Sequence, residues 1–545
     1  MKKDIQYILI PLIKDALVDL GIDKDFARDF YLDLPTDARF GDLSCNIAMR
    51  LSKEVKKSPR DLGLQIVEAL RKHLDKAKLS DYIKEIKVEG AGFMNFYLAD
   101  KYFYEHLQDV VRDGPAALKA DLGKGKKVMI EFVSANPTGS LSVAHARQAA
   151  VGDCLANIFA FLGFNVAREY YLNDEGNQIN ILGDSVRLRA KELEGDKVEF
   201  PENYYQGEYI YDIAREAKDR QIRQEDLGDF AGNFILDIIR KELEDFGVRF
   251  DYWSSQKELG ESGKIELDLE LLKKKGYLYE QDGATWFKST EFGDDKDRVV
   301  IKSDGAYTYL APDIAYHQEK YRRSFQWLIN LWGPDHHGYI SRLKASVAAF
   351  GHDPESLSVV IVQLATIFRD GKIVHMSTRK GQYITLREVL DEVGKDASRF
   401  FFVMRRTSSH LDFDLDVAKK QTAENPIFYV QYAHARISSI LRNAEVKPAK
   451  DVDLAVLKEK EELALIKKIL QFDSILNICL TTLDPYMLTV YLQELSETFH
   501  KFYDRHRVLG QGDALTKARL ALIEGTKIAL ATGLELLGVS RPEKM

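Results

Sequence analysis

The stretch NPTGSLSVAHARQ (136–148) holds three residue types that suit phosphate chemistry: a glycine in a turn, a hydroxyl group, and a histidine at the start of a predicted helix. Gly139 lets the backbone approach a ligand closely, and the free N–H groups of a helix N-terminus attract anions. His145, in the first helical turn, can donate a hydrogen bond to a phosphoryl oxygen as charge develops on it. A lone histidine near a helix start is more often an ordinary surface residue, so this stretch alone leaves both interpretations open.

A second group of candidate residues lies in the basic loop HMSTRKG (375–381). Arg379 and Lys380, with Lys372 and His375 nearby, are cations that can bind phosphates. The loop follows a strand-like segment and precedes the helical part of the chain, which is where a closing lid is expected. Charged loops are usually only solvated, and that remains the alternative.

The elements that must position these residues read as a βαβ unit. KVMIEFV (127–133) is too apolar for a surface strand, and FNVAREYYL (164–172) predicts a second strand. Between them, apolar residues recur at helical spacing from Val151 to Leu162. Strand, helix and strand in close succession predict a Rossmann-like α/β fold, a doubly wound parallel sheet whose ligands collect at the carboxyl ends of the strands.

The rest of the chain predicts two further domains. Residues 1–112 alternate helical patterns with short strands and end in a Gly- and Lys-rich linker, which indicates an α+β N-terminal domain. Residues 113–400 form the Rossmann-like domain, with a charged, Tyr-rich insertion at about 185–300 before WLINLWG (327–333) resumes the sheet. Residues 401–545 are almost continuously helical in period and predict an α-helical bundle.

Composition limits the class of protein. The chain has 545 residues, 45% of them hydrophobic, and Lys14 and Asp15 cut short an apolar N-terminal run, which therefore reads as a folded helix rather than a signal peptide. No apolar stretch approaches the roughly 18 residues of a membrane span. Cys45, Cys154 and Cys479 lie far apart and offer neither a disulfide framework nor a metal site, so we expect a cytoplasmic protein without a structural metal.

The formal net charge of −8 argues against a simple nucleic-acid binder, but its distribution says more than its sum. Lys+Arg and Asp+Glu number 20 and 20 over residues 1–120, 39 and 49 over 121–416, and 18 and 16 over 417–545. Near-neutral flanking domains can carry basic faces for a polyanion, while an acidic middle suits a cationic small molecule. Ordinary solvated surface would give the same imbalance.

EFVSANPTGSLSVAHARQAAVGD (131–153) resembles the first signature of class I aminoacyl-tRNA synthetases, in the form found in arginyl-tRNA synthetases. The family's His-x-Gly-His motif reads Ser-Val-Ala-His here (142–145): the second histidine is kept and the first is serine. HMSTRKGQYITLREVL (375–390) resembles the second signature, Lys-Met-Ser-Lys, with His375 in place of the first lysine.

Further segments resemble the same family in the expected order, so the resemblance covers essentially the whole chain. They are RFGDLSCNIAMRLSK (39–53), YYLNDEGNQI (170–179), YTYLAPDIAYH (307–317), WGPDHHGYISRLKA (332–345), DASRF (396–400), NPIFYVQYAHARISSIL (425–441) and LGVSRPEKM (537–545).

For the amino acid, the resemblance implies a pocket of carboxylates that meets a planar, forked guanidinium. It assigns Glu131, Tyr309 and Asp313 to the guanidinium group of arginine, and Ser134 and Asn136 to the α-amino and carboxylate groups. Without the family context, Asp313 reads as the N-cap of a helix.

For ATP, the resemblance implies contacts from both signatures and from the segment Asp335-His336-His337. This segment suggests a metal cluster at first sight, but adjacent residues cannot readily all face one ion, so we assign it to ribose and, through His336, to the amino acid. His145, Arg379 and Lys380 are the expected catalytic residues. The expected ATP-binding residues are Gly139, Ser142, Ala144, His145, Asp335, His375, Met376, Ser377 and Lys380.

The resemblance therefore implies an arginine–tRNA ligase that activates L-arginine with Mg²⁺-bound ATP and transfers it to the 3′-terminal adenosine of tRNA(Arg), which must be bound first. Phe428, Tyr432 and Arg436 are candidates for the anticodon loop, although their helical spacing is equally typical of a core stripe. A monomer without a membrane partner is expected.

Two alternatives stay open. A catalytically weak or silent synthetase paralogue that binds tRNA or arginine would also show departures such as Ser142 and His375. Another adenylyl-transferring ligase on the same fold is the second, but it would leave both flanking domains without a purpose.

Overall fold

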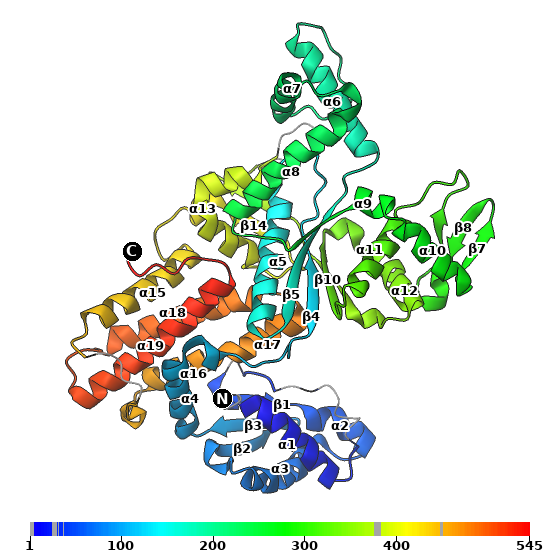
Figure 1. Ribbon diagram of the computed structural model, residues 1–545. Coiled ribbons are helices and arrows are strands. Elements are labelled where there is room, and N and C mark those ends of the chain that lie inside the picture. Colours follow the sequence, from blue (N-terminus) through cyan, green and yellow to red (C-terminus); the bar gives the residue numbers. More distant parts are fainter. Residues whose placement is uncertain (1–4, 24–29, 31, 36, 375–382, 447–450) are drawn as a thin grey trace.

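The computed structural model describes residues 5–23, 30, 32–35, 37–374, 383–446 and 451–545 (Figure 1). Its centre is a five-stranded, all-parallel sheet in the order β11-β10-β4-β5-β6. The strands are β4 (Lys127–Glu131), β5 (Asn165–Leu172), β6 (Tyr252–Ser255), β10 (Trp327–Trp332) and β11 (Leu357–Ile361). The predicted Rossmann-like α/β class is thereby confirmed.

The sheet is covered on both faces because its strands are apolar on both. On β4, Val128 and Ile130 join the core that contains α5 (Val143–Phe161), while Met129 between them joins a separate cluster with Leu343 of α12 (Ile340–Phe350). Successive side chains of a strand point to opposite faces, so a continuous apolar run needs a helix on each side.

The edge strand β6 corrects one expectation, because it lies inside the stretch 185–300 that the sequence places outside the sheet. Its four residues, Tyr252–Ser255, are half-buried or exposed and pair with β5 alone. A short, polar edge strand carries little of the hydrophobic pattern by which strands are recognised.

The remaining parts of that stretch project away from the sheet in two directions (Figure 1). Helices α6 (Asn177–Leu193), α7 (Tyr209–Asp219) and α8 (Leu227–Asp245) extend upward, and α8 leads back to β6. The other part, to the side, leads into α11 (Leu310–Arg322). It comprises α9 (Gln256–Glu261), α10 (Lys264–Lys274), β7 (Leu278–Gln281), β8 (Ala284–Phe287) and β9 (Arg298–Ile301).

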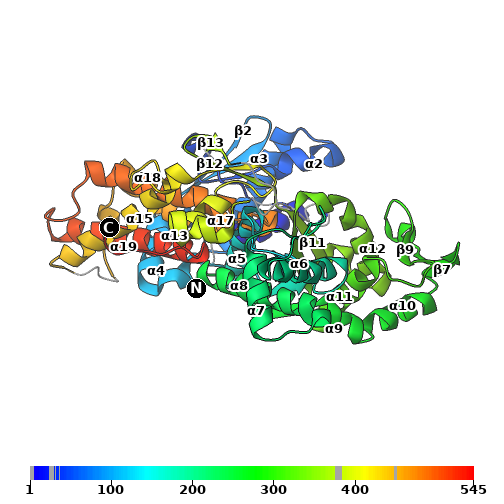
Figure 2. The same cartoon turned by 90° about the horizontal axis from the view of Figure 1, so that it is seen from above.

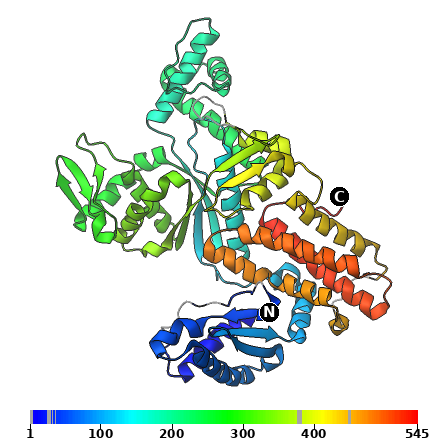
Figure 3. The ribbon, with the colours of Figure 1, turned by 180° about the vertical axis from the view of Figure 1, so that it is seen from behind.

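The N-terminal part is a three-stranded antiparallel sheet with helices, as its alternating pattern predicts. The sheet has the order β1-β3-β2. Its elements are α1 (Ile5–Asp19), β1 (Leu43–Cys45), α2 (Ile47–Val55), α3 (Pro59–Lys76), β2 (Ile83–Glu89), β3 (Phe93–Leu98) and α4 (Asp100–Asp113). Seen from behind in Figure 3, this part lies below the central sheet and is joined to the rest through α4.

The C-terminal part is a helical bundle on the side of the sheet opposite β7–β9 (Figure 2). It consists of α15 (Pro426–Asn443), α16 (Lys460–Leu470), α17 (Phe472–Thr482), α18 (Tyr486–Arg505) and α19 (Asp513–Leu536). Helix α4 packs against α16 and α19, so closely that a Cβ on Gly525 would lie 2.6 Å from Leu107 Cδ1.

No helix among the described residues is both long and apolar enough to span a bilayer.

A small second sheet, β13-β12-β14, sits between the Rossmann-like part and the bundle. It contains β12 (Ala365–Arg369), β13 (Lys372–Ile373) and β14 (Leu411–Asp414), and is flanked by α13 (Leu386–Val403) and α14 (Leu415–Ala418). Strand β14 falls in a region that the sequence predicts as helical throughout. Leu411 and Phe413 are buried and Asp412 is exposed, an alternation of period two that marks a strand.

A buried ionic cluster fastens these parts together. The carboxylate of Asp153, on α5, accepts from Arg399 of α13 (2.6 Å) and from Arg168 of β5 (3.0 Å). Arg399 is fully buried and also donates to the carbonyl of Leu537, beyond the end of α19 (2.7 Å). One guanidinium therefore ties the helix behind the sheet to the last turn of the bundle.

Replacing Asp153 by alanine should destabilise the fold by about 3–5 kcal/mol, because it leaves a buried guanidinium without its carboxylate. Equilibrium urea denaturation followed by circular dichroism measures the change. Asp81→Ala is the control, since Asp81 pairs with Lys101 on the surface and such pairs contribute about 0–1 kcal/mol. Equal losses in the two variants would contradict the importance assigned to the cluster.

Candidate active site

The turn that carries the first signature leaves the carboxyl end of β4 in a strained conformation. Val133 and Ser134 have φ of 69° and 41°, which non-glycine residues rarely adopt. The hydroxyl of Ser134 accepts from the backbone N–H of Tyr171 (3.1 Å) and lies 3.3 Å from Glu131 Oε1. The neighbouring strand β5 thus holds the turn in place as it reverses toward α5.

The turn lines a cavity of about 280 Å³, and the structure brings several predicted site residues together there. Asn136, Gly139, Ser142 and His145 all face it, whereas Ala144 is not among its lining residues. The complete lining is Asn136, Thr138, Gly139, Ser140, Ser142, His145, Tyr205, Gln206, Gly207, Tyr209 and Tyr383. The cavity opens at the carboxyl edge of the sheet and the N-terminus of α5, where a parallel α/β fold binds anions.

Two tyrosines from distant elements fix the backbone of this turn. The hydroxyl of Tyr209, on α7, donates to Thr138 O (2.6 Å), and that of Tyr383 donates to Ser140 O (2.9 Å). Gly139 lies between them. A Cβ there would stand 3.3 Å from the hydroxyl oxygen of Tyr209 and 3.1 Å from that of Tyr383. A larger residue at position 139 would therefore disturb both contacts.

His145 is held as a neutral hydrogen-bond donor. The backbone N–H of Ser142 donates to His145 Nδ1 (3.2 Å), so the ring proton is assigned to Nε2. Burial lowers the pKa of His145 to about 4. The imidazole is consequently uncharged near neutral pH and can offer its Nε2–H to the cavity.

Ser142 joins the two signature regions. It is the N-cap residue of α5, a position that serine favours, and it forms an isolated antiparallel bridge with Thr385. The adjacent Leu141 O accepts from Leu386 N (2.7 Å), the first residue of α13. The first signature is therefore anchored directly to the segment that follows residues 375–382.

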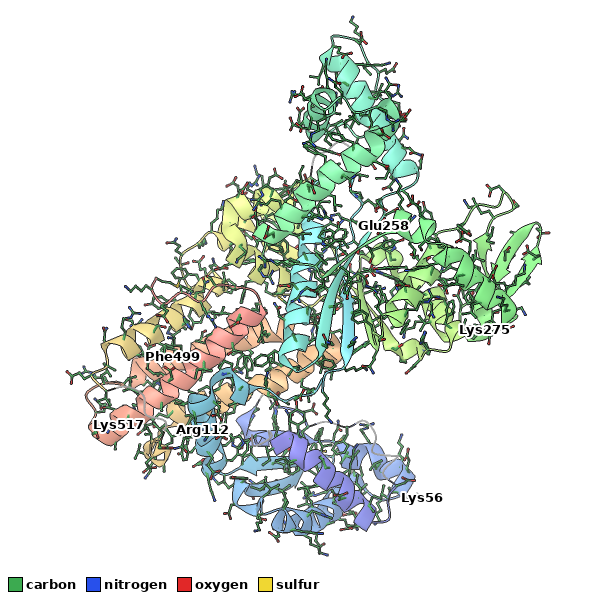
Figure 4. The ribbon with its side chains drawn as sticks, in the orientation of Figure 1. Lys56, Arg112, Glu258, Lys275, Phe499 and Lys517 are labelled. Carbon is green, nitrogen blue, oxygen red and sulfur yellow. The ribbon has the colours of Figure 1, made fainter. Side chains whose placement is uncertain are left out.

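A second cavity of about 260 Å³ lies beyond the turn. Pro137 lines it together with residues of α8 and Glu258 of α9, the side chain labelled near the carboxyl edge of the sheet in Figure 4. Asp174 also lines this cavity, and its carboxylate accepts hydrogen bonds from Ser255 Oγ (2.6 Å) and from Lys257 N (3.1 Å). These contacts join the loop after β5 to the start of α9.

The predicted amino-acid pocket contains a buried cation that the sequence interpretation missed. Lys320 of α11 is fully buried, forms an ion pair with Glu131, and lies 3.5 Å from Glu169 Oε2. Glu169 also pairs with Arg323 (2.7 Å). Glu131 thus already has a positive partner inside the protein. Asp313 and Lys320 lie seven residues apart on one helix, a spacing that could have revealed their common face.

A chain of hydrogen bonds continues along the same face of α11. His317 Nδ1–H donates to Asp313 O (2.8 Å), and Asn330 Nδ2 donates to His317 Nε2 (2.8 Å). Burial, and after it the charge of Lys320, lowers the pKa of His317 to about 3. His317 is therefore a neutral structural link between α11 and β10.

Asp313, on the same helix, forms no ion pair among the described residues, although the nearby charge of Lys320 acts on it and favours its ionised form. Burial is the main cause that raises its pKa to about 7, and the nearby Glu131 adds to the rise. Asp313 lies in the first turn of α11, whose N-cap is Tyr309, so the alternative interpretation of Asp313 as an N-cap does not hold. A buried carboxyl group that can ionise near neutral pH suits a positively charged ligand.

Other predicted residues lie elsewhere. Tyr309 is 80% exposed. Asn136 lines the 280 Å³ cavity, where its amide donates to Gln178 Oε1 (2.6 Å). Asp335 and His336 are exposed on a short 3-10 helix after β10. The expected contacts from His375, Met376, Ser377, Arg379 and Lys380 lie outside the described residues.

The three candidate RNA-binding residues share one face of α15. Phe428 and Tyr432 stack with ring centroids 6.3 Å apart, and Arg436 donates to Tyr432 Oη (2.8 Å) and lies over the ring of Tyr503 (4.5 Å). Tyr432 is exposed and the other two are half-buried, so this face is not a core stripe.

Comparison with known proteins agrees with this architecture. The family "tRNA synthetases class I (R), catalytic domain" matches residues 106–439, "Arginyl tRNA synthetase N terminal domain" matches 8–98, and "DALR anticodon binding domain" matches 430–545. The parallel sheet, the first signature at its carboxyl edge and the helical bundle thus define a class I aminoacyl-tRNA synthetase.

The similarity to individual relatives identifies the family within this class. The chain is 44% identical to "Arginine--tRNA ligase" of Citrifermentans bemidjiense over 100% of both chains, and 46% identical to the ligase of the same name from Geobacillus kaustophilus over 98% of both. The arginyl-tRNA synthetase structure from Thermus thermophilus shares the fold, with a TM-score of 0.81 and 22% identity over 99% of this chain and 100% of that one. This chain belongs to the arginyl-tRNA synthetase family.

The ring of His145 should stay neutral from pH 8 down to pH 5, because burial holds its pKa well below that of a free histidine. NMR of the ¹³Cε1–¹H resonances of labelled histidines, assigned by comparison with His145→Gln, measures this. A titration midpoint above pH 6 for that resonance would show that the ring can become charged near neutral pH and would overturn the assignment.

Proposed function

We propose that this chain is an arginine–tRNA ligase whose adenylation site is the 280 Å³ cavity at the N-terminus of α5. The arginine carboxylate attacks the α-phosphorus of ATP, the bond to the β-phosphate breaks, and pyrophosphate leaves. The arginyl group then passes to the 3′-terminal adenosine of tRNA(Arg), and AMP is released. The observation that carries the proposal is the fixed, neutral His145 beside Gly139 at the mouth of a helix in a family member.

The protein's contribution to this reaction is position and charge stabilisation. His145 donates its Nε2–H to a phosphoryl oxygen, and the free N–H groups at the start of α5 face the same anion. Ser142, in place of the family's first histidine, supplies a short neutral hydroxyl and fixes His145 through its backbone N–H. Mg²⁺, bound as part of the Mg·ATP substrate, would offset part of the negative charge of the phosphates. The negative charge of the departing pyrophosphate is offset by the side chains of Arg379, Lys380 and His375.

Arginine selectivity rests on the charge balance around Glu131 and Asp313. Glu131 and Glu169 are paired with Lys320 and Arg323, which leaves the carboxylate of Asp313 to meet the guanidinium. A guanidinium presents a planar fork of donors, whereas a lysine ammonium would leave part of this arrangement unpaired. Ser134, Asn136, Tyr309 and His336 then bind the rest of the substrate.

The flanking domains, 1–112 and 401–545, bind the tRNA on either side of the catalytic domain, 113–400. The stacked pair Phe428 and Tyr432, with Arg436 beside them, offers aromatic and cationic surfaces of the kind that unstacked RNA bases bind. The 18 basic and 16 acidic residues over 417–545 leave this part of the chain close to neutral overall, so the tRNA contact depends on this local face. The protein works as a monomer in the cytoplasm.

ATP–pyrophosphate exchange should depend on arginine and on cognate tRNA, and lysine should not replace arginine. The reason is that the pocket meets a fork of donors rather than a single ammonium. Filter binding of radioactive ATP formed from labelled pyrophosphate measures the rate. If the protein binds tRNA but shows no exchange under any of these conditions, it is a catalytically silent paralogue. The proposed function is then wrong.

Arginine should bind roughly tenfold more tightly at pH 8 than at pH 6, because a carboxyl group with a pKa of about 7 is about 9% ionised at pH 6 and about 91% at pH 8. The ionised form is the one that pairs with a guanidinium, so binding releases a proton on the acid side of pH 7. Isothermal titration calorimetry in two buffers of different ionisation enthalpy measures affinity and proton release together.

Asp313→Asn is the matched variant, since it keeps the shape and removes the charge. It should bind arginine weakly at both pH values and release no proton. Unchanged proton release in this variant would assign the ionisation to another group.

A further inference from the structure

The nucleotide cavity has a second set of lining residues that the reaction described above leaves unassigned. Tyr205, Gln206, Gly207 and Tyr209 line it together with the turn and the start of α5. They lie in the connection from α6 to α7 and at the first residue of α7, in the part of the chain that extends upward in Figure 1. We call these four residues the insertion wall.

Helix α6 holds the backbone of the insertion wall in place. The guanidinium of Arg189 lies over two aromatic rings, 4.1 Å and 4.4 Å from their centroids, and donates to Gln206 O (2.8 Å). The backbone N–H of Tyr205 donates to Ser185 Oγ (3.0 Å). Because both bonds fix the backbone, the side chains of Tyr205 and Gln206 are presented to the cavity in a preformed arrangement.

The insertion wall is also bonded to the nucleotide turn. Tyr209 Oη donates to Thr138 O (2.6 Å). A Cβ on Gly207 would lie 2.4 Å from Tyr209 Cε1, so glycine is the residue that lets the chain pass this ring. The distance between the insertion wall and the turn is therefore set by a direct hydrogen bond, and both border one ligand space.

The chemistry of the insertion wall suits a nucleoside better than a phosphate. None of the described residues that line the cavity is a lysine, arginine, aspartate or glutamate. Tyr205 offers an aromatic ring, and the exposed side chain of Gln206 makes no hydrogen bond to the described part of the chain. Unstacked RNA bases stack on aromatic rings and form hydrogen bonds along their edges, and a glutamine amide matches N6 and N7 of adenine.

The reaction contains two adenosines, and the geometry favours the one at the 3′ end of the tRNA. The family resemblance assigns the ribose of ATP to Asp335, which lies on the 3-10 helix after β10 and does not line this cavity. The terminal ribose of the tRNA, by contrast, must reach the arginyl group that is held at the nucleotide turn. It therefore enters the cavity that the insertion wall borders.

We propose that Tyr205 and Gln206 bind the 3′-terminal adenosine of the tRNA: the ring of Tyr205 stacks on the adenine, and the amide of Gln206 bonds to its edge. The proposal rests on the proposed function, but binding of the terminal adenosine can be measured without any reaction. The helical insertion is then a part of the acceptor site that selects the last nucleotide of the tRNA.

The binding test compares tRNA(Arg) transcripts with and without the last nucleotide. In the unaltered chain, the transcript that lacks the terminal adenosine should have a Kd about 5- to 100-fold higher, the effect typical of one base stacked on an aromatic ring. In Tyr205→Leu, which keeps an apolar side chain but removes the ring, the two Kd values should be nearly equal. Their ratio cancels the contacts that the tRNA makes elsewhere. Filter binding without ATP or arginine measures it.

Two further variants control this comparison. Tyr205→Phe keeps the ring and should keep the ratio. Tyr204→Leu is the matched control, since Tyr204 does not line the cavity and its hydroxyl donates to Asp184 Oδ2 (3.2 Å). The Kd of the truncated tRNA should be the same in all four proteins, which shows that the variants are folded. A ratio near one in the unaltered chain, or a ratio that survives in Tyr205→Leu, would overturn the proposal.

ATP binding separates the two adenosines. Calorimetry of ATP binding without arginine should give the same Kd in Tyr205→Leu as in the unaltered chain. If the variant binds ATP more weakly and keeps the tRNA ratio, the insertion wall binds the adenosine of ATP, and the proposal is wrong.

Gln206→Ala changes an exposed residue and tests the second contact. The unaltered chain should bind tRNA ending in adenosine about 5- to 100-fold more tightly than tRNA ending in guanosine, and the variant should lose most of this preference. An equal preference in both proteins would contradict the contact with the base. If the unaltered chain shows no pyrophosphate exchange at all, the proposed function is wrong, whereas the Kd ratios still decide whether the insertion wall binds the terminal adenosine.

Discussion

The structure depends on how α5 is held along its length. Its middle is fixed by the buried pair between Asp153 and Arg399, and its first turns by Arg147, whose guanidinium is fully buried. Arg147 Nη1 donates to Gln363 O (2.7 Å), Leu364 O (3.3 Å) and Ser409 O (2.9 Å), and Nη2 donates to Arg406 O (3.0 Å). Because a helix transmits displacement along its axis, the N-terminus that faces the nucleotide cavity is only as well placed as these contacts allow.

The need to place the N-terminus of α5 also explains why several elements contact the short turn at residues 138–142. Residues 138–142 receive hydrogen bonds from α7, from the segment before α13, and from α13 itself. Each contact satisfies a backbone group that would otherwise be buried without a partner. The turn is therefore shaped by groups that lie far away in sequence. The strained residues Val133 and Ser134, just before it, are held by β5, where Tyr171 N–H donates to Ser134 Oγ.

Much of this could be predicted from local pattern. The apolar strand 127–133, the helical spacing after Val151 and the glycine-bearing turn between them predicted the βαβ unit, and the first signature placed Gly139, Ser142 and His145 on one cavity. What local pattern could not give was the partner of a charge. Glu131 was expected to meet a ligand, yet Lys320, 189 residues away, already meets it. Strands β6 and β14 were missed because four polar or mixed residues show too short an alternation, and the roles of Tyr209 and Tyr383 depend on contacts between separate segments.

The buried guanidinium of Arg147 also makes the chain depend on its own product. An ammonium in that place has no planar fork with which to reach four backbone carbonyls, so a lysine inserted by a charging error would leave buried acceptors unsatisfied. The same holds at Arg399. Copies of this ligase made with mischarged tRNA would fold poorly. Any lapse in its discrimination between arginine and lysine would thus reduce the supply of the enzyme that committed it, and its fidelity is coupled to its own renewal.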